Sequence, residues 1–223
     1  MNKITDDIVF TGDVDMSAAT GTVPPGSVNE NSFTSATAFP RSKFAQDAMV
    51  AFPIRLTDFV VHDAPQTKLP GTSANDDLGL YGTTFGTDTP SLKSSDLKTA
   101  GPTTLYARVL IPLPDSYEDE ETVSLRLSAG MLTTVADTAA TVDVEVYKSD
   151  REGGVDGSDL CTTAAQSINS LTLADKDFSI NPDSLTHEDM LDVRITMAIN
   201  DAATGTTVQG IIGAVELRCD RKG

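Results

Sequence analysis

The sequence contains no tryptophan, two histidines and two cysteines in 223 residues. Neither His62 nor His187 stands in a recognisable catalytic pattern, and no nucleophile-elbow, phosphate-loop or zinc-protease motif is present. Cys161 and Cys219 are far apart and form no CxxC pair, so we interpret them as two free thiols, with one disulfide as the alternative. Catalysis needs a tuned base beside a nucleophile or metal. The sequence therefore predicts no enzymatic activity and no cofactor.

Positive charge is also scarce. The chain has 16 basic and 33 acidic residues, so its net charge is −17. Such a chain repels phosphate backbones and anionic lipid surfaces, so we expect neither nucleic acid nor a membrane as a partner. No apolar run of about 18 residues is present, which excludes a membrane-spanning helix. The first residues, "MNKITDDIVF", lack the apolar centre of a secretory signal.

Strand patterns dominate from about residue 46 onward. Apolar and polar side chains alternate with period 2 in several segments, which predicts strands with one buried face. The expected inward residues are Val123, Leu125 and Leu127; Val142, Val144 and Val146; Leu191, Val193, Ile195, Met197 and Ile199; and Val215, Leu217 and Cys219. Glycine, aspartate, asparagine and proline separate these segments, so the pattern predicts an all-β, antiparallel β-sandwich over residues 46–223.

Three other segments are less regular. "MVAFPIRLTDFVVHD" predicts one strand. "TTLYARVLIPLP" is so continuously apolar that we expect a strand covered on both faces, with Pro112 at its end or at an unpaired edge position. The polar stretch from Ala64 to Pro102 is too long for an unstructured loop in a compact domain. It should contain one or two short strands, anchored by Leu78, Leu80 and Tyr81.

Residues 1–45 differ in composition from the rest of the chain. They are rich in Ser, Thr, Ala, Gly and Pro and hold few large apolar side chains, so they cannot bury enough surface to fold alone. We expect an extended N-terminal arm that gains order against a partner.

Acidic residues gather in three places. "DREGGVDGSD" offers Asp150, Glu152, Asp156 and Asp159 as calcium ligands, but their spacing departs from that of an EF-hand and no Glu closes the loop. We therefore predict a polar turn there, with calcium as the alternative. "DSYEDEE", beginning at Asp115, and "ANDDLG", beginning at Ala74, are expected to be solvated.

A carbohydrate-binding module is the alternative to a structural protein, because such modules are often acidic sandwiches. They usually present aromatic platforms to sugar rings. This chain lacks tryptophan, and its outward tyrosines, Tyr106 and Tyr147, look scattered.

From Thr22 to Gly223 the chain resembles tailed-phage virion proteins. The resemblance is carried by several sequence segments, among them "TVPPGSVNENSF…RSKF", "NDDLGLYGTTFGT", "LYARVLIPLP" and "LRLSAGMLTTVADTAATVDVEVYKSD". The resemblance implies a jelly-roll sandwich that forms a homotrimer and decorates or clamps a phage capsid, with the major capsid protein or other virion proteins as partners. It also implies synthesis in the bacterial host cytoplasm and a final location on the capsid surface. The alternative within this resemblance is a head or tail appendage that binds host-surface glycans.

Overall fold

The structure is a computed structural model that describes residues 49–82, 84–98, 101–135, 139–201 and 205–221. The arm expected over residues 1–45 lies outside this part of the chain and stays a prediction. The described residues form two antiparallel β-sheets and one short 3-10 helix. Among them, no helix is long and apolar enough to cross a membrane.

The first sheet has six strands, with the order β11-β7-β13-β5-β4. Strand β13 pairs with β7 along one edge, while the other edge pairs with β5 near the start of β13 and with β1 near its end. The bounds are β1 Val50–Ile54, β4 Gly79–Tyr81, β5 Ser91–Lys93, β7 Val123–Thr133, β11 Ala174–Ile180 and β13 Gln209–Cys219.

The second sheet has seven strands, with the order β10-β8-β12-β6-β2-β3 and with β9 paired to β8. Strand β12 lies at its centre and pairs along nearly its whole length with β8 on one side and β6 on the other. The bounds are β2 Val60–Val61, β3 Ala64–Lys68, β6 Thr103–Pro112, β8 Ala139–Ser149, β9 Val155–Asp156, β10 Gln166–Ser167 and β12 Met190–Asn200.

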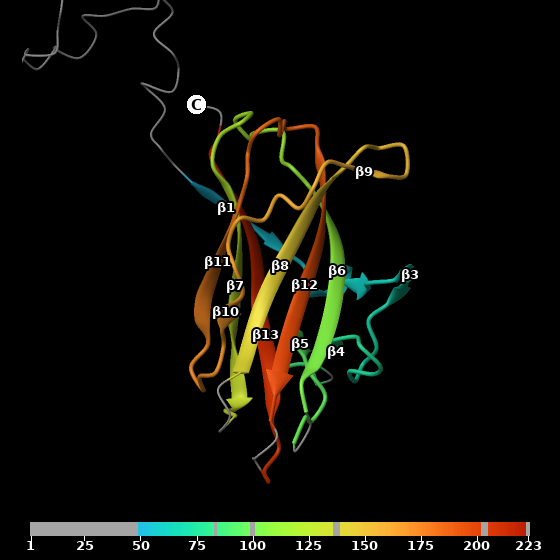
Figure 1. The fold of residues 1–223 in the computed structure, drawn as a ribbon, viewed down its shortest axis with the longest axis vertical. Helices are drawn as coiled ribbons and strands as arrows, with labels where there is room; N and C mark the ends of the chain where they lie inside the picture. Colours follow the sequence, from blue (N-terminus) through green and yellow to red (C-terminus); the bar gives the residue numbers. More distant parts are fainter. Residues whose placement is uncertain (1–48, 83, 99–100, 136–138, 202–204, 222–223) are drawn as a thin grey trace, which may run out of the picture. The chain divides into compact units, whose positions relative to one another are not determined.

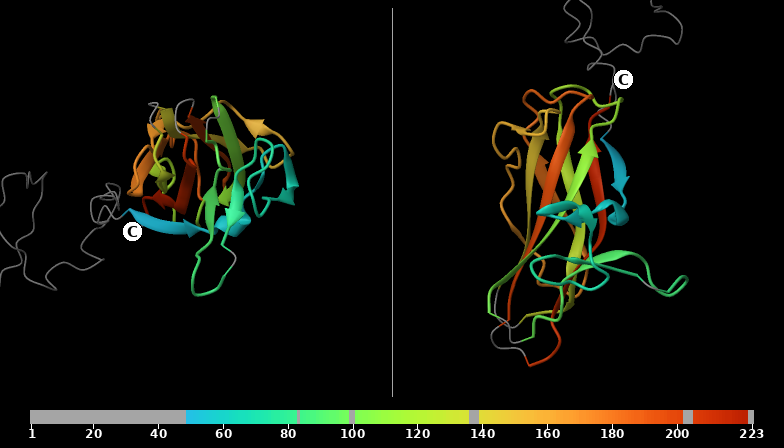
Figure 2. Two further views of the ribbon diagram at one scale, coloured as in Figure 1. Left: turned by 90° about the horizontal axis from the view of Figure 1, so that it is seen from below. Right: turned by 90° about the vertical axis from the view of Figure 1, so that its right-hand side faces the viewer.

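The long strands cross from sheet to sheet in chain order. Strands β6, β8 and β12 belong to the second sheet, and β7, β11 and β13, which alternate with them along the chain, belong to the first. Figure 1 shows β8, β12 and β6 side by side, and the view from below in Figure 2 shows the two layers. The predicted antiparallel β-sandwich of the jelly-roll type is confirmed.

The core lies between the two layers and is built from the alternating strand positions. All of the inward residues expected from the sequence are buried, including Val144 on β8, Ile195 on β12 and Leu217 on β13. Their neighbours in sequence, such as Thr196, are partly exposed. The period-2 pattern therefore identified the correct face of β7, β8, β12 and β13.

Two sequence predictions about strands are wrong. The segment expected to be one strand, residues 49–63, is divided by the 3-10 helix η3 (Leu56–Asp58) into β1 of the first sheet and β2 of the second. Strand β6 is not covered on both faces, because Leu110 is 53% exposed and every second residue of the strand points out of the core. Pro112 does end this strand, as predicted.

The long polar segment from Ala64 to Pro102 contains β3, β4 and β5, one strand more than the upper number expected. Leu78 is fully buried and Leu80 packs against the core. The backbone N–H of Leu78 donates to the carbonyl of Tyr106 on β6 at 2.8 Å. These contacts fix the segment against the edge of the second sheet.

Candidate functional site

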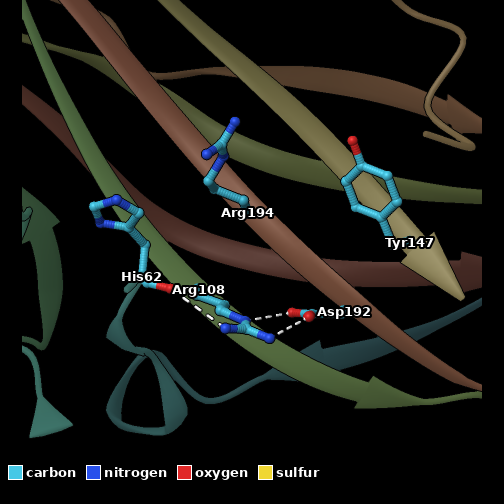
Figure 3. Close-up of a pocket in the computed structure, with 5 residues that line it drawn as sticks. All are labelled: His62, Arg108, Tyr147, Asp192 and Arg194. Carbon is cyan, nitrogen blue, oxygen red and sulfur yellow. Dashed lines mark hydrogen bonds and ion pairs between the residues drawn. The ribbon is translucent and has the colours of Figure 1, made fainter. Parts of the chain in front are cut away.

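The outer face of the second sheet carries ordered polar side chains around a hollow. Outward positions of β6, β8 and β12 meet here because the three strands are antiparallel neighbours in register. The hollow has a volume of about 210 Å³, and we call it the sheet-face hollow. Figure 3 shows its lining residues, His62, Arg108, Tyr147, Asp192 and Arg194.

Arg108 on β6 is held by Asp192 on β12. Its Nε donates to Asp192 Oδ1 at 2.7 Å, and its Nη2 donates to the other carboxylate oxygen (Figure 3). Its Nη1 donates to the backbone carbonyl of His62 at 3.3 Å. The hydrogen bonds to Asp192 raise the pKa of Arg108 above its usual value. Three of its donor nitrogens are thus engaged, which fixes the plane of the guanidinium.

Arg194 on β12 is held in a similar way by Glu145 on β8. Both Nε and Nη2 of Arg194 donate to Glu145 Oε2, the first at 2.7 Å. The Arg194 guanidinium carbon lies 5.1 Å from the centre of the Tyr106 ring. The His62 ring lies 4.5 Å from the same centre, tilted by 39°. Arg194 is therefore oriented by both a carboxylate and an aromatic ring.

Tyr147 on β8 and Tyr106 on β6 lie on the same face of the sheet, on either side of β12. Tyr147 is opposite Asp192, and Tyr106 is opposite Thr196. This register separates them by about 13 Å along the strands and about 10 Å across them. The two tyrosines therefore share a sheet face but lie well apart, as expected, and only Tyr147 lines the sheet-face hollow.

The four calcium candidates lie in the loop that contains β9. Asp150 Oδ1 accepts hydrogen bonds from two backbone N–H groups of its own loop, both at 2.8 Å, and these bonds lower the pKa of Asp150. Asp159 Oδ1 accepts from two other backbone N–H groups at 2.9 Å. Glu152 and Asp156 are exposed. The geometry favours the polar turn, and weak or absent calcium binding stays a prediction.

The other two acidic stretches differ from each other. The carboxylates of Asp115 to Glu121 are exposed around a buried Tyr117, whose hydroxyl donates to the carbonyl of Glu121 at 2.7 Å. That stretch is solvated, as expected. In the stretch from Ala74 to Gly79, however, Asp77 is only 7% exposed. The expectation of a wholly solvated turn is wrong there, because backbone bonds to β6 hold the segment against the sheet.

The two cysteines are free thiols, as interpreted from the sequence. Cys219 is buried in the core, and burial together with the nearby Asp220 raises its pKa to about 11. Burial is also the main cause of the raised pKa of Cys161. Thiols with raised pKa values are poor nucleophiles at neutral pH.

Sequence reasoning missed Arg108 and His62 as site residues. Arg108 belongs to an apolar run, yet Tyr106, Arg108 and Leu110 alternate with buried neighbours, so period 2 was readable there. His62 follows β2 in a tight turn before β3, and no local pattern marks it. Its position beside Arg108 comes only from the pairing of β2 with β6.

No family model matches the chain, and no curated protein matches it. Solved structures with a similar fold include the "xylan-binding module CBM15", at 12% identity and a TM-score of 0.40 over 79% of this chain and 100% of that one. A Family 30 carbohydrate-binding module has 11% identity and a TM-score of 0.38 over 78% and 90%. The CBM22-1 xylan-binding domain of Paenibacillus barcinonensis Xyn10C has 11% identity and a TM-score of 0.35 over 66% and 83%. Likeness at this level carries no argument about what this chain binds, which has to come from its own side chains.

Proposed function

We propose that the chain binds a neutral glycan at the sheet-face hollow. One observation carries the proposal: two guanidinium–carboxylate pairs, Arg108 with Asp192 and Arg194 with Glu145, stand fixed on one sheet face beside the ring of Tyr147. Each pair presents a planar set of hydrogen-bond donors next to acceptors.

A sugar ring is complementary to such a surface. Its neighbouring hydroxyl groups donate and accept hydrogen bonds in pairs, and its axial C–H groups form an apolar patch that packs on an aromatic ring. Because the arginines are already oriented, a bound sugar loses little free energy in ordering them. The tyrosine spacing along β12 leaves room on the face for more than one sugar unit.

Other ligand classes fit less well. An anionic ligand meets a chain of net charge −17, and both arginines of the hollow already have a carboxylate partner. General acid–base catalysis needs a carboxylate within reach of the substrate, whereas Asp192 and Glu145 each accept hydrogen bonds from an arginine guanidinium. Binding without catalysis is the function that this geometry supports best.

The proposal agrees with the alternative role expected from the sequence, that of an appendage that binds host-surface glycans. The other role, capsid decoration by a homotrimer through the N-terminal arm, rests on the resemblance alone. Location on a virion rests on it too.

A glycan array followed by isothermal titration calorimetry tests the proposal with the full chain. We expect Tyr147→Ala and Arg194→Ala to weaken binding of the best glycan by about tenfold or more, about 1.4 kcal/mol. Arg126→Ala is the matched control, because Arg126 forms an equivalent bidentate pair with Asp177, at 2.6 and 2.7 Å, on the other sheet. Equal affinity of the hollow variants and the control for that glycan would refute the site, and an array without any binding would refute the function.

A further inference from the structure

One imidazole and two carboxylates lie together beside the edge of β6. They belong to His62, Asp76 and Asp77. When one ligand atom is taken from each residue, the three atoms all lie within 4.8 Å of one another. His62 Nδ1 is 3.6 Å from Asp77 Oδ1, and His62 Nε2 is 3.8 Å from Asp76 Oδ2. Among the described residues, this is the one group of three or more such side chains with that spacing.

Tyr106 holds all three residues in place. Its backbone N–H donates to the carbonyl of Asp76 at 2.7 Å, and its carbonyl accepts from Leu78 at 2.8 Å, so the turn carrying both aspartates is fixed to β6. Its ring lies against the ring of His62, with 4.5 Å between their centres. The cluster is therefore preorganised by the sheet, although its members come from two separate loops.

Two polar atoms in the cluster are buried and have no hydrogen-bond partner. They are His62 Nδ1 and Asp77 Oδ1, which face each other. Asp77 as a residue is 7% exposed. Their 3.6 Å separation is too long for a hydrogen bond. A buried polar atom without a partner costs free energy, so this arrangement calls for a third group that satisfies both atoms.

We propose that His62, Asp76 and Asp77 bind a divalent transition metal, with Zn²⁺ as the representative ion. A cation coordinated by an imidazole nitrogen and two carboxylate oxygens would satisfy both buried atoms at once. A tetrahedral zinc binds one imidazole nitrogen, and its ligands lie about 3.4 Å from one another. With one atom taken from each residue, the three ligand atoms lie within 4.8 Å of one another. Closing them around an ion therefore needs side-chain movements of about 1 Å. The Asp76 side chain is 54% exposed, which gives the ion a path from solvent.

The donor set distinguishes this ion from calcium and magnesium. Those hard cations take oxygen ligands, whereas imidazole suits zinc and its neighbours in the transition series. Three protein ligands leave the fourth position of a tetrahedral ion to water. The net charge of −17 also raises the local concentration of any cation.

A direct pairing of the His62 ring with both aspartates, without a metal ion, is the competing explanation. It leaves neither nitrogen at hydrogen-bond distance from a carboxylate, since the separations are 3.6 and 3.8 Å. It also predicts no response to a metal ion at neutral pH, which makes the two explanations separable.

The test uses the full chain, treated with a chelator and dialysed. Zn²⁺ is titrated by calorimetry, and thermal unfolding is followed with Zn²⁺, Ca²⁺ or Mg²⁺. We expect one Zn²⁺ per chain and, at about 100 times its dissociation constant, a rise in unfolding midpoint of about 5–10 °C. Ca²⁺ and Mg²⁺ at the same concentration should leave the midpoint within about 1 °C, far below the shift that linked binding produces.

Asp76→Asn is the decisive variant, because Asp76 is exposed and its loss should leave the fold intact. We expect Zn²⁺ affinity to fall at least tenfold. Asp119→Asn is the matched control: Asp119 pairs with His187 Nδ1 at 3.0 Å but belongs to no three-ligand group among the described residues. Co²⁺ absorption provides a second readout, since a band from tetrahedral cobalt should appear in the parent chain and be lost in His62→Gln. No Zn²⁺ response, or an equal response in Asp76→Asn and the parent chain, would overturn the proposal. Because glycan binding is measured separately, failure of the metal site leaves the proposed function standing.

Discussion

Replacing Ile195 with alanine tests the register of the whole second sheet. Ile195 is fully buried at the centre of β12, between Val144 on β8 and Ala107 on β6. The change removes three carbons, worth about 2.5 kcal/mol by transfer from water. The cavity left behind adds about 1–2 kcal/mol. We therefore expect the free energy of unfolding to fall by about 3.5–4.5 kcal/mol.

Thr196→Ala provides the control one position along the strand. Thr196 is partly exposed on the outer face, opposite Tyr106 and Asp143. Its replacement should change the free energy of unfolding by no more than about 0.5 kcal/mol. Urea unfolding of both variants and of the parent chain measures the difference, and Ile195→Ala should lower the midpoint without changing the m-value. In thermal unfolding the same loss corresponds to a fall of about 7–18 °C in the midpoint.

Similar losses from Ile195→Ala and Thr196→Ala would refute the reasoning. The side-chain period of a strand is two, so a slip of one residue exchanges the inner and outer faces. Such a slip would also move Arg194 and Asp192 into the core, and the sheet-face hollow would not exist.

Two further predictions concern acid stability and a close backbone approach. Burial raises the pKa of Asp189, but its hydrogen bond with Lys148, at 3.0 Å, and bonds from a nearby threonine outweigh burial and hold the pKa below its usual value. The carboxylate therefore stabilises the fold above about pH 4, and this stabilisation is lost as the pH falls through its lowered folded-state pKa. Asp189→Asn should lower the free energy of unfolding by about 1–2 kcal/mol at pH 7. Urea unfolding should show that the difference from the parent chain shrinks below about pH 4. A difference that does not change with pH would contradict a stabilising role for the Asp189 carboxylate. Gly79→Ala should destabilise the chain strongly, because the new Cβ would lie 2.4 Å from the backbone nitrogen of Ser73, whereas Gly71→Ala meets no atom within 4 Å. Equal unfolding midpoints for the two alanine variants would show that β4 does not approach this turn.

The candidate sites depend on contacts that no local pattern contains. The alternation "LDVRIT" already placed Asp192 and Arg194 on one outward face of a strand. It could not show that β6 and β8 flank that strand, so the partners Arg108 and Glu145 were not foreseeable. Strand neighbours far apart in sequence are chosen by the packing of the complete sandwich.

The local sequence pattern determined the fold class of this chain, whereas the tertiary structure determined which side chains form its candidate sites. Period-2 alternation and the turn residues between strands predicted half-buried antiparallel strands, because strands with one apolar face become stable when two sheet layers bury those faces against each other. Burial of Asp77 and its approach to His62 had no such local cause, since a turn rich in aspartate and asparagine normally faces water. Only the docking of that turn onto Tyr106, by two backbone hydrogen bonds, brought a carboxylate out of solvent and next to an imidazole.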